Sequence, residues 1–166
     1  MIELIILDVD GTMTNGQITY SSSGEELKSF CVKDGLAIVS WQRLNKKVAI
    51  ITGRESSVVK RRAKELGIEF LYQKVKEKDK KIEEILAKLN LSWENVAVIG
   101  DDLNDYPMFS KAKYSFAPAN ASSYIKKIAT HTLDAKGGEA AVRAMIEHLV
   151  ELEGLEEEFL NLWVAK

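Results

Sequence analysis

The chain has 166 residues, of which 46% are hydrophobic and 29% are charged, and its net charge is −2. These values are ordinary for a globular protein, and the absence of excess positive charge argues against a nucleic-acid or membrane surface. The single cysteine, Cys31, excludes an internal disulfide and a cysteine-rich zinc site, and we expect it to be a small buried residue. The opening apolar run is too short for a signal peptide or a membrane span, so we expect one cytoplasmic domain, residues 1–166.

The first predicted strand ends in two acidic residues. Residues 2–7 are apolar except for one glutamate, which is typical of a buried strand, and Asp8, Asp10 and Gly11 follow directly. Side chains alternate along a strand, so Asp8 and Asp10 would share a face at the edge of the sheet where ligands bind. Two carboxylates this close repel each other unless a cation or a shared proton lies between them. This edge therefore predicts a metal, a catalytic proton, or both.

A β-hairpin is predicted immediately after this strand, at about residues 14–33. Residues 18–20 and 27–32 favour β structure, and residues 21–24 form a turn cluster. Because a lone hairpin is marginally stable in water, it should pack against this chain or a partner.

Helices and strands then alternate to the end of the chain. We expect strands at 47–51, 68–72, 96–99, 114–117 and 132–133, and helices at 34–44, 55–67, 77–89, 121–129 and 139–152. This order predicts an α/β fold with a doubly wound parallel sheet, Rossmann-like, with the hairpin flap and no separate cap domain. Asp34 either caps its own helix or contacts a ligand. His131 and His148 are isolated, and we interpret both as packing or surface residues. The amphipathic tail, at about 153–166, either folds back on the core or docks on a neighbouring subunit.

Three further strand ends carry candidate functional residues. Thr52, Gly53 and Arg54 follow the strand at 47–51. Lys78 opens the helix at 77–89, with Lys74 and Lys76 as alternatives in the same lysine-rich run. A third group, Asp101, Asp102 and Asp105, follows the strand at 96–99. Acidic residues at a second strand end again indicate a cation, and hard oxygen ligands favour Mg²⁺.

These motifs, in this order, resemble those of the haloacid dehalogenase-like phosphohydrolases. The segments concerned are DVDGTMTNG at 8–16, VKDG at 32–35, TGR at 52–54, GDDLND at 100–105 and GGEAAVR at 137–143. Taken together they resemble the capless subfamily that contains 3-deoxy-D-manno-octulosonate 8-phosphate phosphatase, whose close relatives act on nine-carbon sugar-acid phosphates.

The resemblance implies a magnesium-dependent phosphatase with an aspartyl-phosphate intermediate. Asp8 would be the nucleophile and Asp10 the acid and base, while Thr52 and Lys78 would steady the phosphoryl oxygens. The metal ligands would be the carboxylates of Asp8 and Asp101 and the backbone carbonyl of Asp10, with support from Asp102 or Asp105.

The resemblance also implies a substrate and an assembly. The substrate would be a small-molecule sugar-acid phosphate, either 3-deoxy-D-manno-octulosonate 8-phosphate from lipopolysaccharide precursor synthesis or a nine-carbon analogue. Its contacts would come from Thr52, Gly53, Arg54, Lys78 and Asp34. We expect a homotetramer in which the hairpins meet through Ile18, Tyr20, Leu27 and Phe30.

Two other classes of protein compete with this interpretation. A signalling receiver domain would need its phosphorylated aspartate after the third strand, where this chain has Tyr72 and Gln73. A binding module that has lost catalysis would not need Asp8, Asp10 and Asp101 together. We therefore favour the phosphatase.

Overall fold

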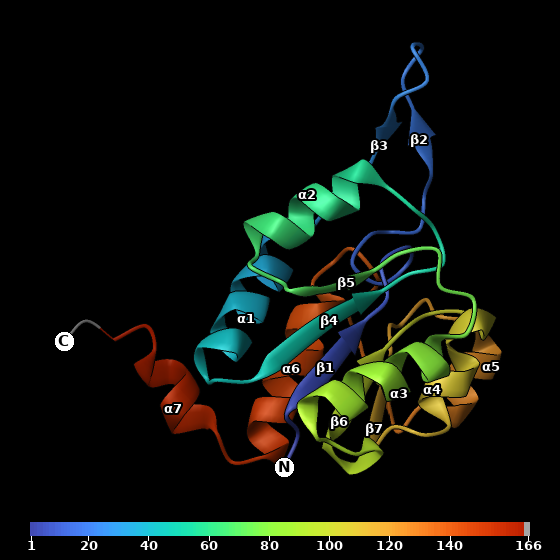
Figure 1. Cartoon of the computed structure of the whole chain (residues 1–166). Helices are drawn as coiled ribbons and strands as arrows, with labels where there is room; N and C mark the ends of the chain where they lie inside the picture. Colours follow the sequence, from blue (N-terminus) through green and yellow to red (C-terminus); the bar gives the residue numbers. More distant parts are fainter. Residues whose placement is uncertain (165–166) are drawn as a thin grey trace.

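A six-stranded parallel sheet forms the centre of the protein, whose residues 1–164 are described by a computed structural model (Figure 1). The strands are β1 (Leu4–Leu7), β4 (Lys47–Ile51), β5 (Phe70–Tyr72), β6 (Val96–Ile99), β7 (Tyr114–Ala117) and β8 (His131–Thr132). Their order is β5-β4-β1-β6-β7-β8, and every neighbouring pair is parallel. The chain therefore winds outward from β1 in both directions, which confirms the predicted doubly wound sheet.

Helices cover both faces of this sheet. They are α1 (Val32–Arg43), α2 (Ser57–Glu65), α3 (Lys78–Leu89), α4 (Tyr106–Phe109), α5 (Ser123–Ile128), α6 (Ala141–Leu152) and α7 (Glu156–Asn161), and 3-10 turns occupy Trp93–Asn95 and Leu103–Asp105. Outside the hairpin, every predicted strand and helix boundary lies within two residues of the observed one.

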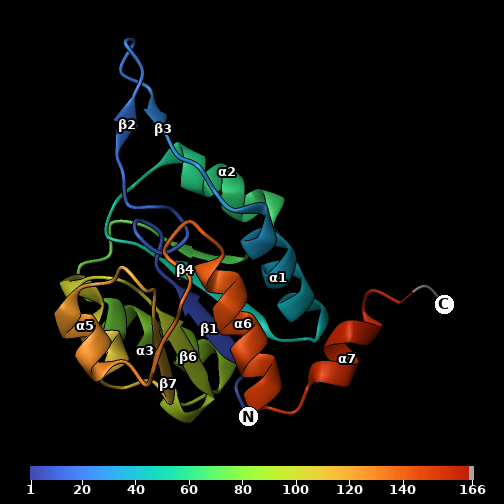
Figure 2. The ribbon, with the colours of Figure 1, turned by 180° about the vertical axis from the view of Figure 1, so that it is seen from behind.

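The core consists of two layers, one on each side of the sheet. Ile5 and Leu7 of β1 face α1, α2 and α6, whereas Leu4 and Ile6 face α3, α4 and α5. Figure 1 places α3 in front of the sheet, and Figure 2, seen from behind, places α6 there. Because both faces of β1 are covered, the strand is apolar at every position rather than at alternate ones.

The hairpin projects beyond α2 and away from the body of the protein (Figure 1). Its strands, β2 (Thr19–Tyr20) and β3 (Glu26–Leu27), pair antiparallel and are shorter than predicted. The predicted second strand stops early because Phe30 turns inward and packs against the main core. Among the described residues there is no separate cap domain, so the hairpin is the structure that overhangs the carboxyl edge of the sheet.

Asp34 does not cap its own helix, so that part of the prediction is wrong. The N-cap position of α1 is Cys31, which is half-buried rather than buried, and Asp34 lies in the first helical turn. Its buried carboxylate accepts a hydrogen bond from the backbone N of Arg143 at 2.8 Å. The N-cap residue of α6, Ala140, has no side chain that can accept, so Asp34 satisfies an N–H group at the start of α6 from another helix.

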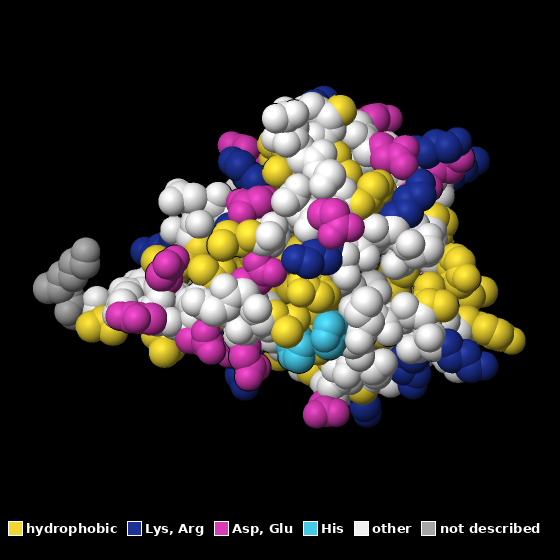
Figure 3. All heavy atoms as spheres, turned by 90° about the horizontal axis from the view of Figure 1, so that it is seen from below, with side chains coloured by type: hydrophobic (Ala, Val, Ile, Leu, Met, Phe, Trp, Pro, Cys, Tyr) yellow, Lys and Arg dark blue, Asp and Glu magenta, His cyan; other side chains and the backbone are white. Residues whose placement is uncertain are grey.

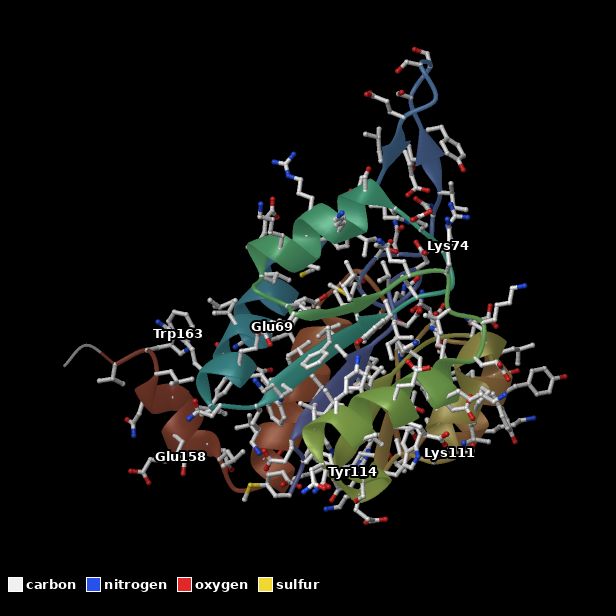
Figure 4. All side chains as sticks on the ribbon, in the orientation of Figure 1. Glu69, Lys74, Lys111, Tyr114, Glu158 and Trp163 are labelled. Carbon is white, nitrogen blue, oxygen red and sulfur yellow. The ribbon has the colours of Figure 1, made fainter. Side chains whose placement is uncertain are left out.

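The tail folds back on the core. Phe159 of α7 is buried in the layer that contains α1 and α6. The indole Nε1 of Trp163 donates to Ser40 Oγ at 3.2 Å, and the guanidinium of Arg43 lies 4.9 Å from the Trp163 ring centre (Figure 4). Residues 165–166 of the predicted tail lie outside the described residues.

The two histidines are packing residues, as expected. His131 stacks on Phe116 with ring centres 4.9 Å apart, and His148 lies 4.5 Å from His131. Figure 3 shows them side by side on one face of the protein. Within residues 1–164, none of the helices has the length and apolar character needed to cross a membrane.

Candidate active site

The carboxyl ends of β1, β4 and β6 open into one pocket. Leu7 pairs with Ile50 of β4 and with Ile99 of β6, so the residues that follow these strands emerge at the same edge. The pocket has a volume of about 270 Å³ and is lined by Asp8, Asp10, Gly16, Thr52, Gly53, Arg54, Asp101, Asp102 and Asn104. The pocket thus brings together the acidic residues that the sequence predicts and the predicted substrate contacts Thr52 and Arg54.

Three carboxylates meet at this edge of the sheet, where Asp8 and Asp101 line the pocket and Asp105 is fully buried. One oxygen from each of Asp8, Asp101 and Asp105 lies within 4.8 Å of the other two. Burial raises the pKa of Asp8 to about 8, the charge of Asp105 adds to the rise, and Lys78 opposes it. Burial likewise raises the pKa of Asp101 to about 7, and the charges of Asp105 and Asp102 contribute. Ionisation of both carboxyl groups is therefore disfavoured by burial and by the neighbouring acids, and a hard divalent cation would offset that cost.

Lys78 supplies the positive charge that this cluster does have. Its Nζ donates to Asp8 Oδ1 and to Asp105 Oδ1, each at 2.6 Å, and its side chain is 1% exposed. Burial alone lowers the pKa of Lys78, but the two aspartate charges outweigh it and the pKa is raised. The alternatives point elsewhere, since Lys76 is exposed and the exposed Lys74 (Figure 4) forms an ion pair with Glu55.

Asp105 holds the loop after β6 in place. Its Oδ1 accepts from Lys78, and its Oδ2 accepts from the backbone N of Asp101 at 2.9 Å and of Asp102 at 3.3 Å. Asp102, by contrast, is exposed and accepts from the N of Leu103 at 2.8 Å. The sequence left open whether Asp102 or Asp105 supports the metal ligands. Asp105 is the one that belongs to the acidic cluster.

The loop after β1 packs against its surroundings without space for side chains. Gly11 has a φ of +90°, and a Cβ there would lie 2.0 Å from Asp101 Oδ2. A Cβ on Gly137 would lie 1.8 Å from the carbonyl oxygen of Gly11. The segment at 137–138 therefore supports the loop that carries Asp8 and Asp10.

Asp10 meets a group of charges from the hairpin. Its Oδ1 accepts from Lys28 Nζ, and its Oδ2 lies 3.8 Å from Arg54 Nε. Arg54 Nη2 in turn donates to Glu26 Oε2 at 2.8 Å. Sequence reasoning missed Lys28 and Glu26, because charged residues on a short hairpin look like ordinary solvated positions.

Of two further predicted substrate contacts, Thr52 lines the pocket and Asp34 does not. Thr52 is 2% exposed and lies beside Gly53 in the pocket wall. Asp34, in the first turn of α1, contacts the start of α6, and the described residues that line the pocket do not include it.

Comparison with known proteins identifies this arrangement. A family model described as haloacid dehalogenase-like hydrolase matches residues 70–145. The fold and the acidic site agree with that match, and the chain is a haloacid dehalogenase-like hydrolase. The chain is 41% identical to 3-deoxy-D-manno-octulosonate 8-phosphate phosphatase from Salmonella typhi, over 92% of this chain and 81% of the relative. It belongs to the 3-deoxy-D-manno-octulosonate 8-phosphate phosphatase family.

Two solved structures of this family superpose closely. The Yersinia pestis enzyme has a TM-score of 0.91 and 40% identity, covering 94% of this chain and 84% of its own. The Moraxella catarrhalis enzyme, in complex with a magnesium ion, a phosphate ion and a KDO molecule, has a TM-score of 0.92 and 33% identity. That match covers 97% of this chain and 93% of the Moraxella chain.

Replacement of Lys78 by Met should destabilise the protein strongly. The change leaves buried carboxylates without their cation, which costs ~3–5 kcal/mol for a broken buried ion pair. The measurement is urea unfolding in the presence of a chelator, and added Mg²⁺ should recover part of the loss.

The matched control is Lys111→Met, which breaks ion pairs with Asp79 and Glu83 at the protein surface (Figure 4). Such exposed pairs contribute little to stability. Equal losses of unfolding free energy in the two variants would contradict the assigned role of Lys78.

Proposed function

We propose that this protein is a cytoplasmic, magnesium-dependent phosphatase that hydrolyses 3-deoxy-D-manno-octulosonate 8-phosphate through an aspartyl-phosphate. The observation that carries this proposal is the cluster of Asp8, Asp101 and Asp105 around Lys78 at adjacent strand ends. Family membership and the name of the Salmonella relative support the choice of substrate. A phosphatase for a nine-carbon sugar-acid phosphate is the alternative within the same chemistry.

The residues present fit a magnesium ion. The carboxylates of Asp8 and Asp101 and the backbone carbonyl of Asp10 would hold it, and Asp105 would support them by fixing Lys78 and the backbone of Asp101. Bound magnesium supplies positive charge against the repulsion between a carboxylate and a phosphate dianion. This repulsion is about 4 kcal/mol for each pair of unit charges 4 Å apart at an effective dielectric constant near 20.

Asp8 is the proposed nucleophile. Lys78 holds its Oδ1, which restricts the carboxylate to one orientation at the end of β1. Attack of an Asp8 oxygen on phosphorus forms a P–O bond, and the bond from phosphorus to the sugar oxygen breaks. The hydroxyl of Thr52 and the ammonium of Lys78 would steady the phosphoryl oxygens during this transfer.

Asp10 is the proposed acid and base. It donates a proton to the sugar oxygen as that oxygen leaves with the electron pair of the broken P–O bond. It then takes a proton from the water that attacks the aspartyl-phosphate. Phosphate is released and the Asp8 carboxylate is regenerated.

Arg54 is the proposed contact for the substrate carboxylate. Its guanidinium lies at the rim of the pocket, and its side chain is 42% exposed. A guanidinium pairs with a planar carboxylate through two parallel hydrogen bonds. The Glu26 carboxylate that Arg54 contacts has the same planar shape and charge as a substrate carboxylate, which supports this proposal.

Removal of the metal should abolish activity. With 3-deoxy-D-manno-octulosonate 8-phosphate as substrate, phosphate release should stop in a chelator, return with Mg²⁺, and return poorly with Ca²⁺, because Ca²⁺ is larger and less strict in its geometry. Asp8→Asn should be inactive under all conditions, whereas Asp134→Asn, at an exposed position, should match the unchanged protein. Full turnover after exhaustive chelation would overturn the proposed function.

Replacement of Arg54 by Ala should weaken binding of sugar acids selectively. We expect KM to rise about tenfold or more for 3-deoxy-D-manno-octulosonate 8-phosphate, which corresponds to the loss of one charge-assisted contact of ~1.5–3 kcal/mol. KM for 4-nitrophenyl phosphate, which has no carboxylate, should change little. Arg61→Ala, on the exposed face of α2, is the matched control. A similar rise in KM for both substrates would remove Arg54 from recognition of the carboxylate.

We also propose that the hairpins join four copies of this chain. Ile18, Tyr20 and Leu27 expose 48%, 61% and 52% of their surface, which leaves an apolar patch on a thin two-stranded element. Phe30, predicted as a fourth contact, packs inside the chain instead.

Light scattering at micromolar concentration should give the mass of a tetramer. Leu27→Asp should lower that mass because it places a charge in the proposed interface, and Leu160→Asp, at an exposed position on α7, should leave it unchanged. A fully active monomer would refute the proposed assembly.

A further inference from the structure

Lys28, on the hairpin, places its buried ammonium group against Asp10, the proposed general acid and base. Lys28 directly follows β3, and its side chain is only 1% exposed although it lies at the base of an exposed hairpin. Its Nζ donates to Asp10 Oδ1. A lysine is rarely buried to this extent unless its charge is compensated, so the contact with Asp10 is a defining feature of its environment.

Lys28 and Asp10 face the pocket differently. Asp10 lines the pocket, and its side chain is 22% exposed. Lys28 is not among the described residues that line it, although its ammonium donates to a carboxylate that is.

The contact with Lys28 gives the two carboxylate oxygens of Asp10 different surroundings. Oδ1 is occupied by Lys28, whereas Oδ2 lies 3.8 Å from Arg54 Nε, beyond hydrogen-bond distance. Oδ2 is therefore the oxygen that can exchange a proton with a leaving group. Without Lys28 the carboxyl group would be free to rotate about its side-chain bonds, and the reactive geometry would be one of several.

Glu26 joins this contact to the rest of the pocket rim. Its Oε1 lies 3.6 Å from Lys28 Nζ and makes no hydrogen bond within the described residues, while its Oε2 accepts from Arg54. The position of Lys28 is thus fixed by Asp10 on one side and by Glu26 on the other.

We infer that Lys28 is a positioning residue for Asp10, which holds the carboxyl group so that Oδ2 faces the leaving oxygen of the substrate. The inference rests on the acid and base role that the proposed function gives to Asp10. In the step concerned, the proton on Oδ2 passes to the sugar oxygen, which takes the electron pair of the breaking P–O bond. Lys28 keeps its proton and contacts neither substrate nor metal.

The test compares two substrates that differ in their need for a proton. The sugar alcohol of 3-deoxy-D-manno-octulosonate 8-phosphate is a poor leaving group, whereas the phenolate of 4-nitrophenyl phosphate leaves without protonation. Because general acid catalysis contributes roughly 10²–10⁴-fold, Lys28→Met should lower kcat for the sugar phosphate by about 10–100-fold. KM should change by less than about twofold, and kcat for the aryl phosphate by less than about threefold.

Two further variants separate positioning from a general structural role. Lys28→Gln keeps a donor but loses the charge, so its kcat for the sugar phosphate should lie above that of Lys28→Met and below that of the unchanged protein. In an Asp10→Asn background, adding Lys28→Met should lower kcat for the sugar phosphate by less than about a further twofold, because the effects of two residues that act as a unit are not additive. Lys60→Met, an exposed lysine on α2, should behave as the unchanged protein.

Several outcomes would overturn the inference. Equal losses of kcat on both substrates would indicate general damage to the hairpin, and a rise in KM for the sugar phosphate alone would make Lys28 a substrate contact. Additive losses in the Asp10→Asn background would show that Lys28 acts independently of Asp10. If Lys28→Met does not fold, the ratio of the two kcat values for Lys28→Gln decides, and an unchanged ratio counts against positioning.

Failure of the proposed function itself gives a different result. In that case the unchanged protein hydrolyses neither substrate, or Asp10→Asn lowers kcat equally on both. If Asp10→Asn is selective for the sugar phosphate and Lys28→Met is not, only the inference about Lys28 fails.

Discussion

The active site depends on one buried interaction, the contact of the Lys78 ammonium with Asp8 and Asp105. Carboxylates from the ends of β1 and β6 lie within a few ångströms of each other, and burial strengthens their repulsion. Lys78 compensates part of this charge and fixes the orientation of both partners. Burial, followed by the charge of Asp105, raises the pKa of Asp8 to about 8 even though Lys78 opposes the rise. The same imbalance that costs folding energy makes the site receptive to a divalent cation.

The rest of the fold keeps this charged cluster rigid. β1 is buried on both faces, so its carboxyl end cannot shift without disturbing two core layers. Gly11 packs on Asp101, and Gly137 packs on Gly11, which brings three segments that are far apart in the sequence together at the site. Asp34 fixes the start of α6, the helix that follows Gly137. Residues far from the pocket thereby restrict the loop that carries Asp8 and Asp10.

The hairpin contributes polar contacts to the rim of the pocket. Lys28 and Glu26 reach back from β3 to Asp10 and Arg54, so the charges at the pocket rim belong to two elements of one chain. The apolar side chains of Ile18, Tyr20 and Leu27 on the same hairpin are exposed.

The sheet, the helices and most of the residues that line the pocket could be predicted from the sequence. Buried strands and amphipathic helices have local periodicities, which is why boundaries agree within two residues outside the hairpin. Asp8, Asp10, Thr52 and Asp101 were predictable because each follows a strand, and parallel strands end at the same edge.

Which charged side chains contact each other depends on how the elements pack, and this became visible in the tertiary structure. It places Lys78, the lysine that the sequence favours, at Asp8, and it places Asp105 rather than Asp102 in the acidic cluster. Asp34 contacts a backbone group 109 positions away, and Lys28 contacts Asp10 across 18 positions. Contacts of this kind leave no periodic signal in the chain, since each depends on how separate elements pack and on how much water they exclude. The position of the tail also depends on such a contact, because Trp163 donates a hydrogen bond to Ser40, which lies 123 positions earlier in the chain.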